Sequence, residues 1–182
     1  MDFLKDQFSV KGKVAWVTGG SYGIGLSIAL AYAKAGAKIA FNDINQELVD
    51  KGLAAYKEAG FDVKGYVCDV TDEQAVQKTA RLIEQDLGPV DILVNNAGII
   101  RRTPMHEMSV EDWRLVVDID LTAPFIVAKA VLPSMMERRS GKIINVCSMM
   151  SELGRETVAA YAAAKGGLKM LTRNIASEYG KY

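Results

Sequence analysis

The chain has 182 residues, 49% of them hydrophobic, which is enough for one domain with a substantial core. Basic residues (Lys and Arg) and acidic residues (Asp and Glu) each number 22, so the formal net charge is zero. A balanced charge argues against nucleic acid or an anionic membrane as a general partner. Residues 1–13 mix charged with apolar side chains, a pattern typical of neither a signal peptide nor a transmembrane helix.

Strands and helices are predicted to alternate along the chain, with glycines marking several helix ends. The predicted strands are mostly continuous apolar runs, typical of parallel strands covered by helices on both faces. The pattern therefore predicts an α/β protein with a doubly wound parallel sheet of Rossmann type, in a single domain over residues 1–182. In chain order the predicted elements are strand 13–18, helix 24–34, strand 37–42, helix 46–58, strand 63–68, helix 72–86, strand 91–95, a helical stretch 111–139 that Pro124 and Pro133 kink or divide, strand 142–147 and helix 158–179.

A glycine-rich loop, T-G-G-S-Y-G-I-G, connects the first predicted strand to the first predicted helix. Glycines at such a turn let main-chain N–H groups approach a pyrophosphate and let the helix pack closely on the strand. The spacing differs from the common G-x-G-x-x-G fingerprint, and an ordinary strand-to-helix turn is the alternative interpretation. Its position directly after the first strand favours dinucleotide binding. The residues predicted to contact the cofactor here are Gly19, Ser21, Tyr22, Gly23, Ile24 and Gly25.

Asp43 ends the second strand, where an acidic side chain can accept hydrogen bonds from the hydroxyls of an adenosine ribose. A 2′-phosphate there would meet like-charge repulsion, on the order of 4 kcal/mol for charges 4 Å apart at an effective dielectric of 20, which favours NAD. A rotated Asp43 or a nearby cation would reduce this penalty and admit NADP. Helix capping by Asp43 or Asn45 is the alternative role. We predict that Asp43 and its neighbour Ile44 border the cofactor.

Tyr161 and Lys165 are one helical turn apart and share a face of the last predicted helix. A lysine ammonium near a phenol stabilises the phenolate, which lets a tyrosine act as general acid or base at working pH. Ser148, at the end of the last predicted strand, is placed to donate a hydrogen bond to a substrate oxygen. A Y-x-x-x-K spacing also arises by chance, so a solvated helical face is the alternative interpretation.

Several motifs occur in a fixed order: T-G-G-S-Y-G-I-G, C-D-V at 68–70, N-N-A-G at 95–98, Ser148, and Y-A-A-A-K at 161–165. This series resembles the short-chain dehydrogenase/reductase family from Gly12 onward. The resemblance implies an enzyme that moves a hydride between NAD or NADP and a carbonyl or alcohol, with Ser148, Tyr161 and Lys165 as catalytic residues. It also implies that Lys165 holds the nicotinamide ribose. Further cofactor-binding residues implied by the resemblance are Asp69, Val70, Asn96, Ala97, Gly98 and Tyr161.

Three longer stretches, F-N-D-I-N-Q-E-L-V-D, N-N-A-G-I-I-R-R and I-N-V-C-S-M-M-S-E-L-G-R-E-T, resemble family members that act on sugar acids. This resemblance implies interconversion of D-gluconate and 5-keto-D-gluconate. A sugar acid carries a carboxylate, which arginine can bind through two parallel hydrogen bonds. Arg102 and Arg155 are therefore candidate substrate residues beside Ser148 and Tyr161. Solvated loop arginines are the alternative interpretation.

The chain departs from the family pattern at two places. In V-D-I-D-L-T-A-P-F, Asp120 stands where the family usually has an asparagine that belongs to a proton relay. An ionised aspartate accepts hydrogen bonds but has no amide N–H to donate, so we keep Asp120 as a catalytic candidate whose role in proton delivery is open. The sequence also stops at Tyr182, whereas family members continue with two more strands and a segment that covers the substrate. We therefore expect a truncated fold with an unpaired strand edge.

Few other residues point to chemistry. Cys68 and Cys147 lie in apolar runs and have the character of reduced thiols, and His106 has no second histidine, so no metal site is predicted. We expect a cytoplasmic protein with a small-molecule sugar acid as substrate, no nucleic-acid or membrane partner, and a homo-oligomeric state, a tetramer in the complete enzyme. Two alternatives stay open: a polyol or 3-oxoacyl reductase of the same family, and a catalytically silent dinucleotide-binding module.

Overall fold

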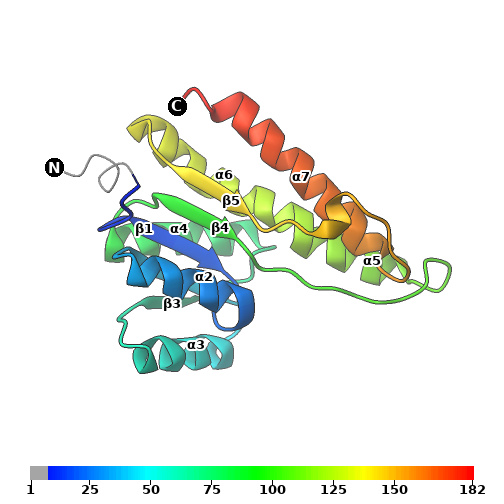
Figure 1. Cartoon of the computed structure of the whole chain (residues 1–182), viewed down its shortest axis with the longest axis horizontal. Helices are drawn as coiled ribbons and strands as arrows, with labels where there is room; N and C mark the ends of the chain where they lie inside the picture. The colour runs from blue at the N-terminus through cyan, green and yellow to red at the C-terminus, as the bar shows by residue number, and fades with distance from the viewer. Residues whose placement is uncertain (1–7) are drawn as a thin grey trace.

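Five parallel strands form one sheet in the order β3-β2-β1-β4-β5 (Figure 1). The computed structural model describes residues 8–182; for residues 1–7 the prediction that no signal peptide is present lies outside the described residues. Every strand end falls within two residues of its predicted position, which confirms the predicted parallel sheet of Rossmann type. The single domain over residues 1–182 stays a prediction. The strands are β1 (Val14–Thr18), β2 (Lys38–Asp43), β3 (Lys64–Val67), β4 (Ile92–Asn95) and β5 (Lys142–Asn145).

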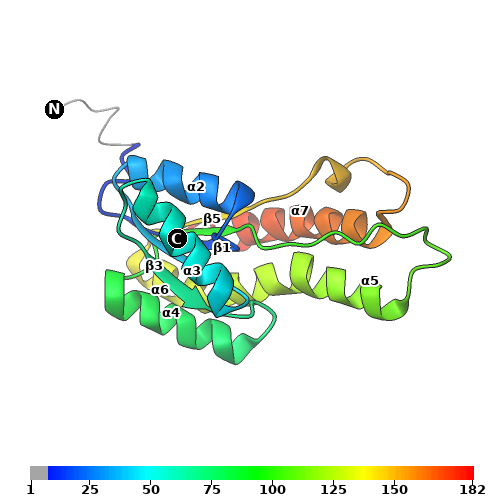
Figure 2. The same ribbon diagram turned by 90° about the horizontal axis from the view of Figure 1, so that it is seen from below.

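Helices cover both faces of the sheet (Figure 2). Helices α2 and α3 pack on one face and α4 and α6 on the other, while α7 runs beside α6 and contacts β5. Gly36, with a φ of 91°, follows α2 as the predicted stop. The helices are α2 (Gly23–Lys34), α3 (Gln46–Glu58), α4 (Glu73–Leu87), α5 (Val110–Val117), α6 (Ala123–Arg138) and α7 (Ala159–Tyr179), with a π-helical turn η1 (Asp118–Thr122) and a 3-10 helix η2 (Met149–Ser151).

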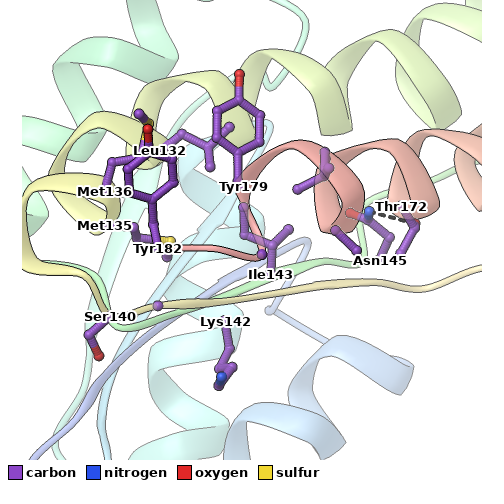
Figure 3. A pocket seen from close by; sticks show the side chains of 14 residues that line it. Leu132, Met135, Met136, Ser140, Lys142, Ile143, Asn145, Thr172, Tyr179 and Tyr182 are labelled. Carbon is purple, nitrogen blue, oxygen red and sulfur yellow. Dashed lines mark hydrogen bonds between the residues drawn. The ribbon is translucent and has the colours of Figure 1, made fainter.

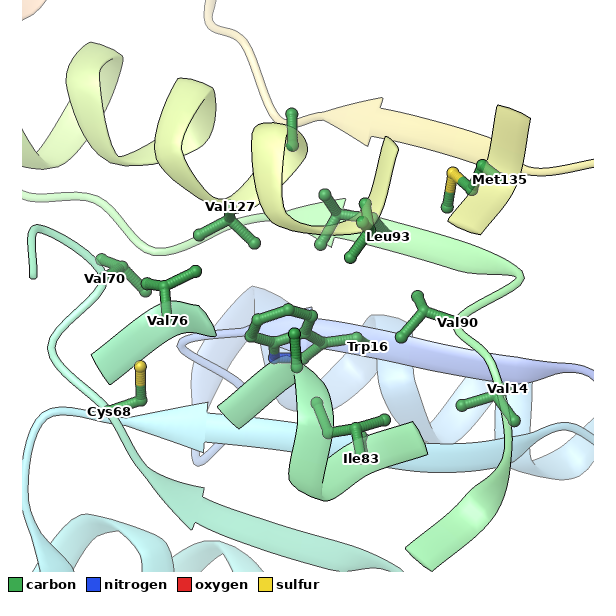
Figure 4. Close-up of a cluster of buried hydrophobic side chains, with 14 of the residues drawn as sticks. Val14, Trp16, Cys68, Val70, Val76, Ile83, Val90, Leu93, Val127 and Met135 are labelled. Atoms are coloured by element: carbon green, nitrogen blue, oxygen red, sulfur yellow. The ribbon is translucent and has the colours of Figure 1, made fainter. Parts of the chain in front are cut away.

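The central strand β1 supplies side chains to both core layers. Val14 and Trp16 face α4 and α6, whereas Ala15 and Val17 face α2 and α3. Trp16 is completely buried at the centre of the first layer (Figure 4), and its indole N–H donates to Asn42 Oδ1 at 2.9 Å. This bond satisfies the one polar atom of the ring, so a buried tryptophan costs no unpaired donor here. The tight core fixes the ends of β1 and β4, where the candidate site is built.

The long helical stretch is continuous and contains a π-helical turn that the prolines alone did not predict. This turn, η1, lies between α5 and α6, and Pro124 follows it in the first turn of α6. Helix α6 continues through Pro133, so of the two outcomes predicted there, a kink or a division, the division does not occur. Pro133 has no N–H to donate to the carbonyl of Lys129, one turn earlier in the helix. The turn η1 brings Asp120 into the site described below.

Strand β5 is an edge strand, in agreement with the predicted unpaired edge. A hollow of about 270 Å³ lies beside it, between the ends of α6 and α7 (Figure 3). Its lining includes Leu132, Met136 and Tyr179 and is mainly apolar. This hollow lies at the edge of the sheet, away from the strand ends that carry the sequence motifs.

Candidate active site

The larger cleft opens at the carboxyl ends of β1 and β4, where the order of the strands reverses direction. In doubly wound sheets this crevice is the usual ligand site. The cleft has a volume of about 630 Å³. It is lined by all the residues predicted to bind the cofactor except Ser21, whose side chain is buried and 1% exposed. The predicted residues in the lining are Gly19, Tyr22, Gly23, Ile24, Gly25, Asp43, Ile44, Asp69, Val70, Asn96, Ala97, Gly98, Tyr161 and Lys165, together with Asp120.

The glycine loop is locked to the segment after β4 by hydrogen bonds. Asn96 Nδ2 donates to the carbonyls of Thr18 and Gly19 at 3.0 and 3.1 Å. In return, Thr18 Oγ1 accepts the main-chain N–H groups of Asn96 and Ala97 at 3.0 and 3.1 Å. A Cβ at Gly25 would lie 2.2 Å from the carbonyl oxygen of Gly19, so no side chain fits there. The loop therefore keeps its main chain close to the cleft.

The N-terminus of α2 is suited to binding an anion. Helices α3, α4 and α5 are capped by side chains of Asn45, Asp72 and Ser109, which accept N–H groups of the first turn. Helix α2 follows Tyr22, has no side-chain cap and carries no acidic residue in its first turn, and its first residues line the cleft. Free N–H groups and the positive end of a helix dipole together favour a phosphate.

Asp43 ends β2 and presents an unsatisfied acceptor. Its Oδ1 accepts the N–H of Ile44 at 2.9 Å, while Oδ2 is buried and has no hydrogen-bond partner within residues 8–182. The side chain of Asn45 caps α3, since it accepts the N–H of Leu48 at 2.9 Å. Asp43 therefore does not have the capping role that was its alternative. A buried acceptor needs a donor, and a ribose hydroxyl would supply one. The cleft thus fits a nicotinamide dinucleotide at both its phosphate and its ribose.

Lys165 and Tyr161 meet at the inner end of the cleft. Lys165 is 4% exposed, and its Nζ lies 5.6 Å from the centroid of the Tyr161 ring, close enough for the ammonium to act on the phenol. The ammonium donates to the carbonyl oxygen of Val146 at 3.1 Å and forms an ion pair with Asp120 Oδ2 at 3.3 Å. A buried ammonium is tolerated only with such partners. Val146 was missed by sequence reasoning because its contribution is a main-chain carbonyl, which no residue type reveals.

Ser148 is held at the start of η2 by a reciprocal pair of hydrogen bonds. Its Oγ accepts the N–H of Met150 at 3.1 Å, and Ser151 Oγ accepts the N–H of Ser148 at 3.2 Å. Ser151 Oγ also donates to the carbonyl oxygen of Lys165 at 2.9 Å, which ties η2 to α7. The Ser148 hydroxyl acts as acceptor in this arrangement, so its proton stays available to a substrate oxygen. The capping role of Ser151 was not predicted, although its spacing from Ser148 is that of a capping box.

The predicted substrate arginines lie on two loops that touch. Thr103 N–H donates to the carbonyl oxygen of Thr157 at 2.9 Å, joining the loop after β4 to the loop before α7 (Figure 1). Arg102 and Arg155 flank this contact, and both are exposed and outside the lining of the cleft. Arg101, which sequence reasoning did not select, lines the cleft.

Neither a membrane-spanning helix nor a cluster of metal ligands occurs in the part of the chain that the structure describes. Between residues 8 and 182, no helix combines the length and apolar character needed to cross a membrane. Over the same range, His, Cys, Asp and Glu side chains form no group of three or more that could hold a metal ion. Cys68 is buried and Cys147 half-buried, and both are free thiols.

Comparison with known families agrees with this geometry. The family model described as short chain dehydrogenase matches residues 13–182. The chain belongs to this family. Membership confirms the resemblance seen in the sequence and the predicted enzyme class, an oxidoreductase that uses NAD or NADP.

Individual relatives are similar over nearly the whole chain. The 2-dehydro-3-deoxy-D-gluconate 5-dehydrogenase of Formosa agariphila is 54% identical over 97% of this chain and 67% of its own length. The crystal structure of 2-keto-3-deoxy-D-gluconate dehydrogenase from Streptococcus agalactiae is 71% identical, with a TM-score of 0.84, over 98% of this chain and 67% of that one. A gluconate 5-dehydrogenase from Burkholderia cenocepacia, solved with NADP and tartrate, is 40% identical, with a TM-score of 0.91, over 98% of this chain and 70% of that one.

Proposed function

We propose that the protein interconverts an alcohol and a ketone at C5 of a six-carbon sugar acid, with D-gluconate and 5-keto-D-gluconate as the first candidate pair. The observation that carries this proposal is the buried Lys165 ammonium, held by Asp120 and Val146 beneath the Tyr161 ring in the cleft. Such an arrangement supports proton transfer by the tyrosine. Dehydrogenases of this family transfer a hydride. The names of the similar dehydrogenases given above specify sugar acids as their substrates.

In the reductive direction, the carbonyl oxygen of the substrate would accept a hydrogen bond from Ser148, whose proton is available. A bound nicotinamide supplies the hydride. Tyr161 then gives its proton to the same oxygen as negative charge develops there, and Lys165 stabilises the phenolate that remains. Oxidation runs in reverse, with Tyr161 accepting the proton of the C5 hydroxyl.

A second substrate, 2-dehydro-3-deoxy-D-gluconate, is favoured by the high identity of relatives that bear its name, 54% and 71%. Both substrates carry a carboxylate and a C5 hydroxyl. Comparing kcat/KM for these two acids with an uncharged polyol and a 3-hydroxyacyl thioester tests the proposal. We expect at least one sugar acid to exceed both non-acids. Preferential turnover of the polyol or the thioester would instead support the alternative of a polyol or 3-oxoacyl reductase of the same family.

Arg102 and Arg155 are proposed to hold the substrate carboxylate from their adjoining loops. We expect Arg102→Ala or Arg155→Ala to raise the KM for the sugar acid roughly tenfold with little change in kcat, because a charge-assisted pair is lost from the bound state. Steady-state kinetics measures this effect. Arg81→Ala, on the exposed surface of α4, is the matched control. Unchanged KM in both loop variants would contradict the assignment.

Asp43 is proposed to select the nucleotide. Asp43→Asn removes the charge that opposes a 2′-phosphate but keeps the side-chain oxygen, so kcat/KM for NADP relative to NAD should rise roughly tenfold or more. The ratio is measured with saturating sugar acid. Asp50→Asn, an exposed carboxylate on α3, serves as control and should leave the ratio unchanged. An unaltered ratio in Asp43→Asn would mean that Asp43 does not face the ribose.

Assembly and location stay predictions. Helices α5 and α6 carry exposed apolar side chains, among them Trp113 (39% exposed) and Phe125 (50% exposed). Such side chains are consistent with the predicted homo-oligomer, which sedimentation would test. The cytoplasmic location rests on the sequence argument alone. The silent dinucleotide-binding module, the alternative from another class, predicts nucleotide binding without turnover of any sugar acid.

A further inference from the structure

We propose that Lys51 forms a subsite for the 2′-phosphate of NADP and is the cation that lets this cleft accept a phosphorylated ribose beside Asp43. The inference goes beyond the proposed reaction, because it concerns the choice of nucleotide and holds for any substrate. It rests on the proposed place of Asp43 at the adenosine ribose.

The ammonium of Lys51 lies at the rim of the cleft, on the side of the proposed ribose site. Its Nζ is 5.8 Å from the centroid of the Tyr22 ring, a distance at which a cation is attracted to an aromatic face. Tyr22 lines the cleft and directly precedes α2, whose first residues also belong to the lining. Lys51 therefore places a full positive charge next to a helix N-terminus that is itself suited to an anion.

Helix α3, which carries Lys51, is fixed against the glycine loop at this point. It packs on the same face of the sheet as α2 (Figure 2). Gly52 follows Lys51, and a Cβ at Gly52 would lie 2.9 Å from the Cα of Ser21, so the two main chains approach closely. Leu48, one turn before Lys51 on the same helical face, lines the cleft. Main-chain packing thus sets the base of the Lys51 side chain, and only its flexible stem has to move for the ammonium to reach a ligand.

Lys51 is not committed to a neighbouring carboxylate. Glu47 precedes it by four residues, the spacing at which a glutamate and a lysine can pair on a helix. Within residues 8–182, however, no carboxylate oxygen lies within 4.0 Å of the Lys51 ammonium. Asp50, the other acidic neighbour on α3, accepts a hydrogen bond from the side chain of Gln46 at 2.7 Å. The ammonium, which contacts an aromatic ring and no counter-charge, is therefore open to an anion.

The charges around the ribose site act in opposite directions on a 2′-phosphate. Asp43 repels it, whereas Lys51 and the N-terminus of α2 attract it. NAD has a hydroxyl in place of this phosphate, so the charge of Lys51 has little to act on when NAD binds. Asp69, a further acidic residue of the lining, accepts the N–H and the hydroxyl of Thr71 at 2.9 and 2.7 Å. The balance between Lys51 and Asp43 therefore sets the preference between the two nucleotides.

The test measures nucleotide binding without substrate, so it does not depend on turnover. Two pairs of probes differ only by the 2′-phosphate: NADPH and NADH, followed by nicotinamide fluorescence, and adenosine 2′,5′-bisphosphate and adenosine 5′-monophosphate, followed by calorimetry. Lys51→Met keeps the length of the side chain and removes its charge. It should weaken binding of the phosphorylated member of each pair about fivefold and leave the other within about twofold, because one exposed charge-assisted contact is lost. Added salt should reduce this advantage of Lys51 over methionine.

Three further variants separate the charge of Lys51 from its position. Lys51→Arg keeps a cation at the same place, so the ratio of the two dissociation constants within a pair should stay within about twofold of the original. Lys57→Met removes an exposed lysine from the last turn of the same helix and should leave the ratio unchanged. Asp43→Asn removes the opposing charge and should shift the ratio in the direction opposite to Lys51→Met.

The outcomes decide between a phosphate subsite and a solvated surface lysine. Weaker binding of both phosphorylated probes in Lys51→Met, with recovery in Lys51→Arg, supports the subsite. An unchanged ratio in Lys51→Met, an equal change in Lys57→Met, or no recovery with arginine would overturn it. The expected change in binding together with no turnover of any sugar acid would uphold this inference and refute the proposed function.

Discussion

Tyr161→Phe is expected to lower kcat by roughly 10²–10⁴-fold in both directions, because it removes the group that exchanges a proton with the substrate oxygen. The ring remains, so its packing above Lys165 should be preserved. The rate is followed through the absorbance of the reduced nicotinamide. Nucleotide affinity and the free energy of unfolding should stay close to those of the unaltered protein.

Tyr32→Phe is the matched control for this prediction. Tyr32 lies on α2, outside the lining of the cleft, and loses the same hydroxyl. Its kcat should remain within about twofold of the original, since surface changes away from a site have small effects. A Tyr161→Phe enzyme that keeps full activity would show that the proton comes from another group.

Gly25→Ala is expected to lower the free energy of unfolding by about 3 kcal/mol and to abolish nucleotide binding. An added Cβ would lie 2.2 Å from the carbonyl oxygen of Gly19 and 2.5 Å from Nδ2 of Asn96. Both atoms belong to the hydrogen-bonded junction between the glycine loop and the segment after β4, so neither can move without breaking it. Denaturant unfolding and fluorescence titration with reduced nucleotide measure the two effects.

Substitutions at two other glycines separate the effect of steric overlap from that of backbone strain. Gly23 has open space around an added Cβ but a φ of 59°, so Gly23→Ala should cost about 1 kcal/mol through backbone strain. Gly154 has open space and no positive φ, and Gly154→Ala should change stability by less than ~0.5 kcal/mol. Equal stability of Gly25→Ala and Gly154→Ala would contradict the close approach of the loop to Asn96.

Local patterns were sufficient to predict the sheet, and the family resemblance completed the outline of the cleft. Continuous apolar runs predicted parallel strands because the inner strands β1, β2 and β4 are covered on both faces, as Trp16 and Val17 of β1 illustrate. The glycine loop and Asp43 could be placed because the fold brings the ends of neighbouring parallel strands to one edge. For Asp43, cofactor binding was preferred to capping of α3, and the structure shows that Asn45 caps α3.

The polar contacts inside the site could not be predicted in the same way. Asp120 and Lys165 are far apart in the sequence, and their ion pair forms where the π-helical turn η1 packs against α7. The carbonyl oxygen of Val146 belongs to the main chain, so no residue type signals its role. Pro133 was expected to kink or divide a helix that in fact continues through it. These features depend on packing and not on local sequence.

The most direct test of the central claim is the absorbance of the reduced nicotinamide when purified protein is mixed with 5-keto-D-gluconate and either NADH or NADPH. We predict a steady decrease in absorbance with one of these nucleotides, and its loss in Tyr161→Phe. Nucleotide binding without any decrease, for this substrate and for the ketone formed at C5 of 2-dehydro-3-deoxy-D-gluconate, would contradict the assignment of the protein as a sugar-acid oxidoreductase.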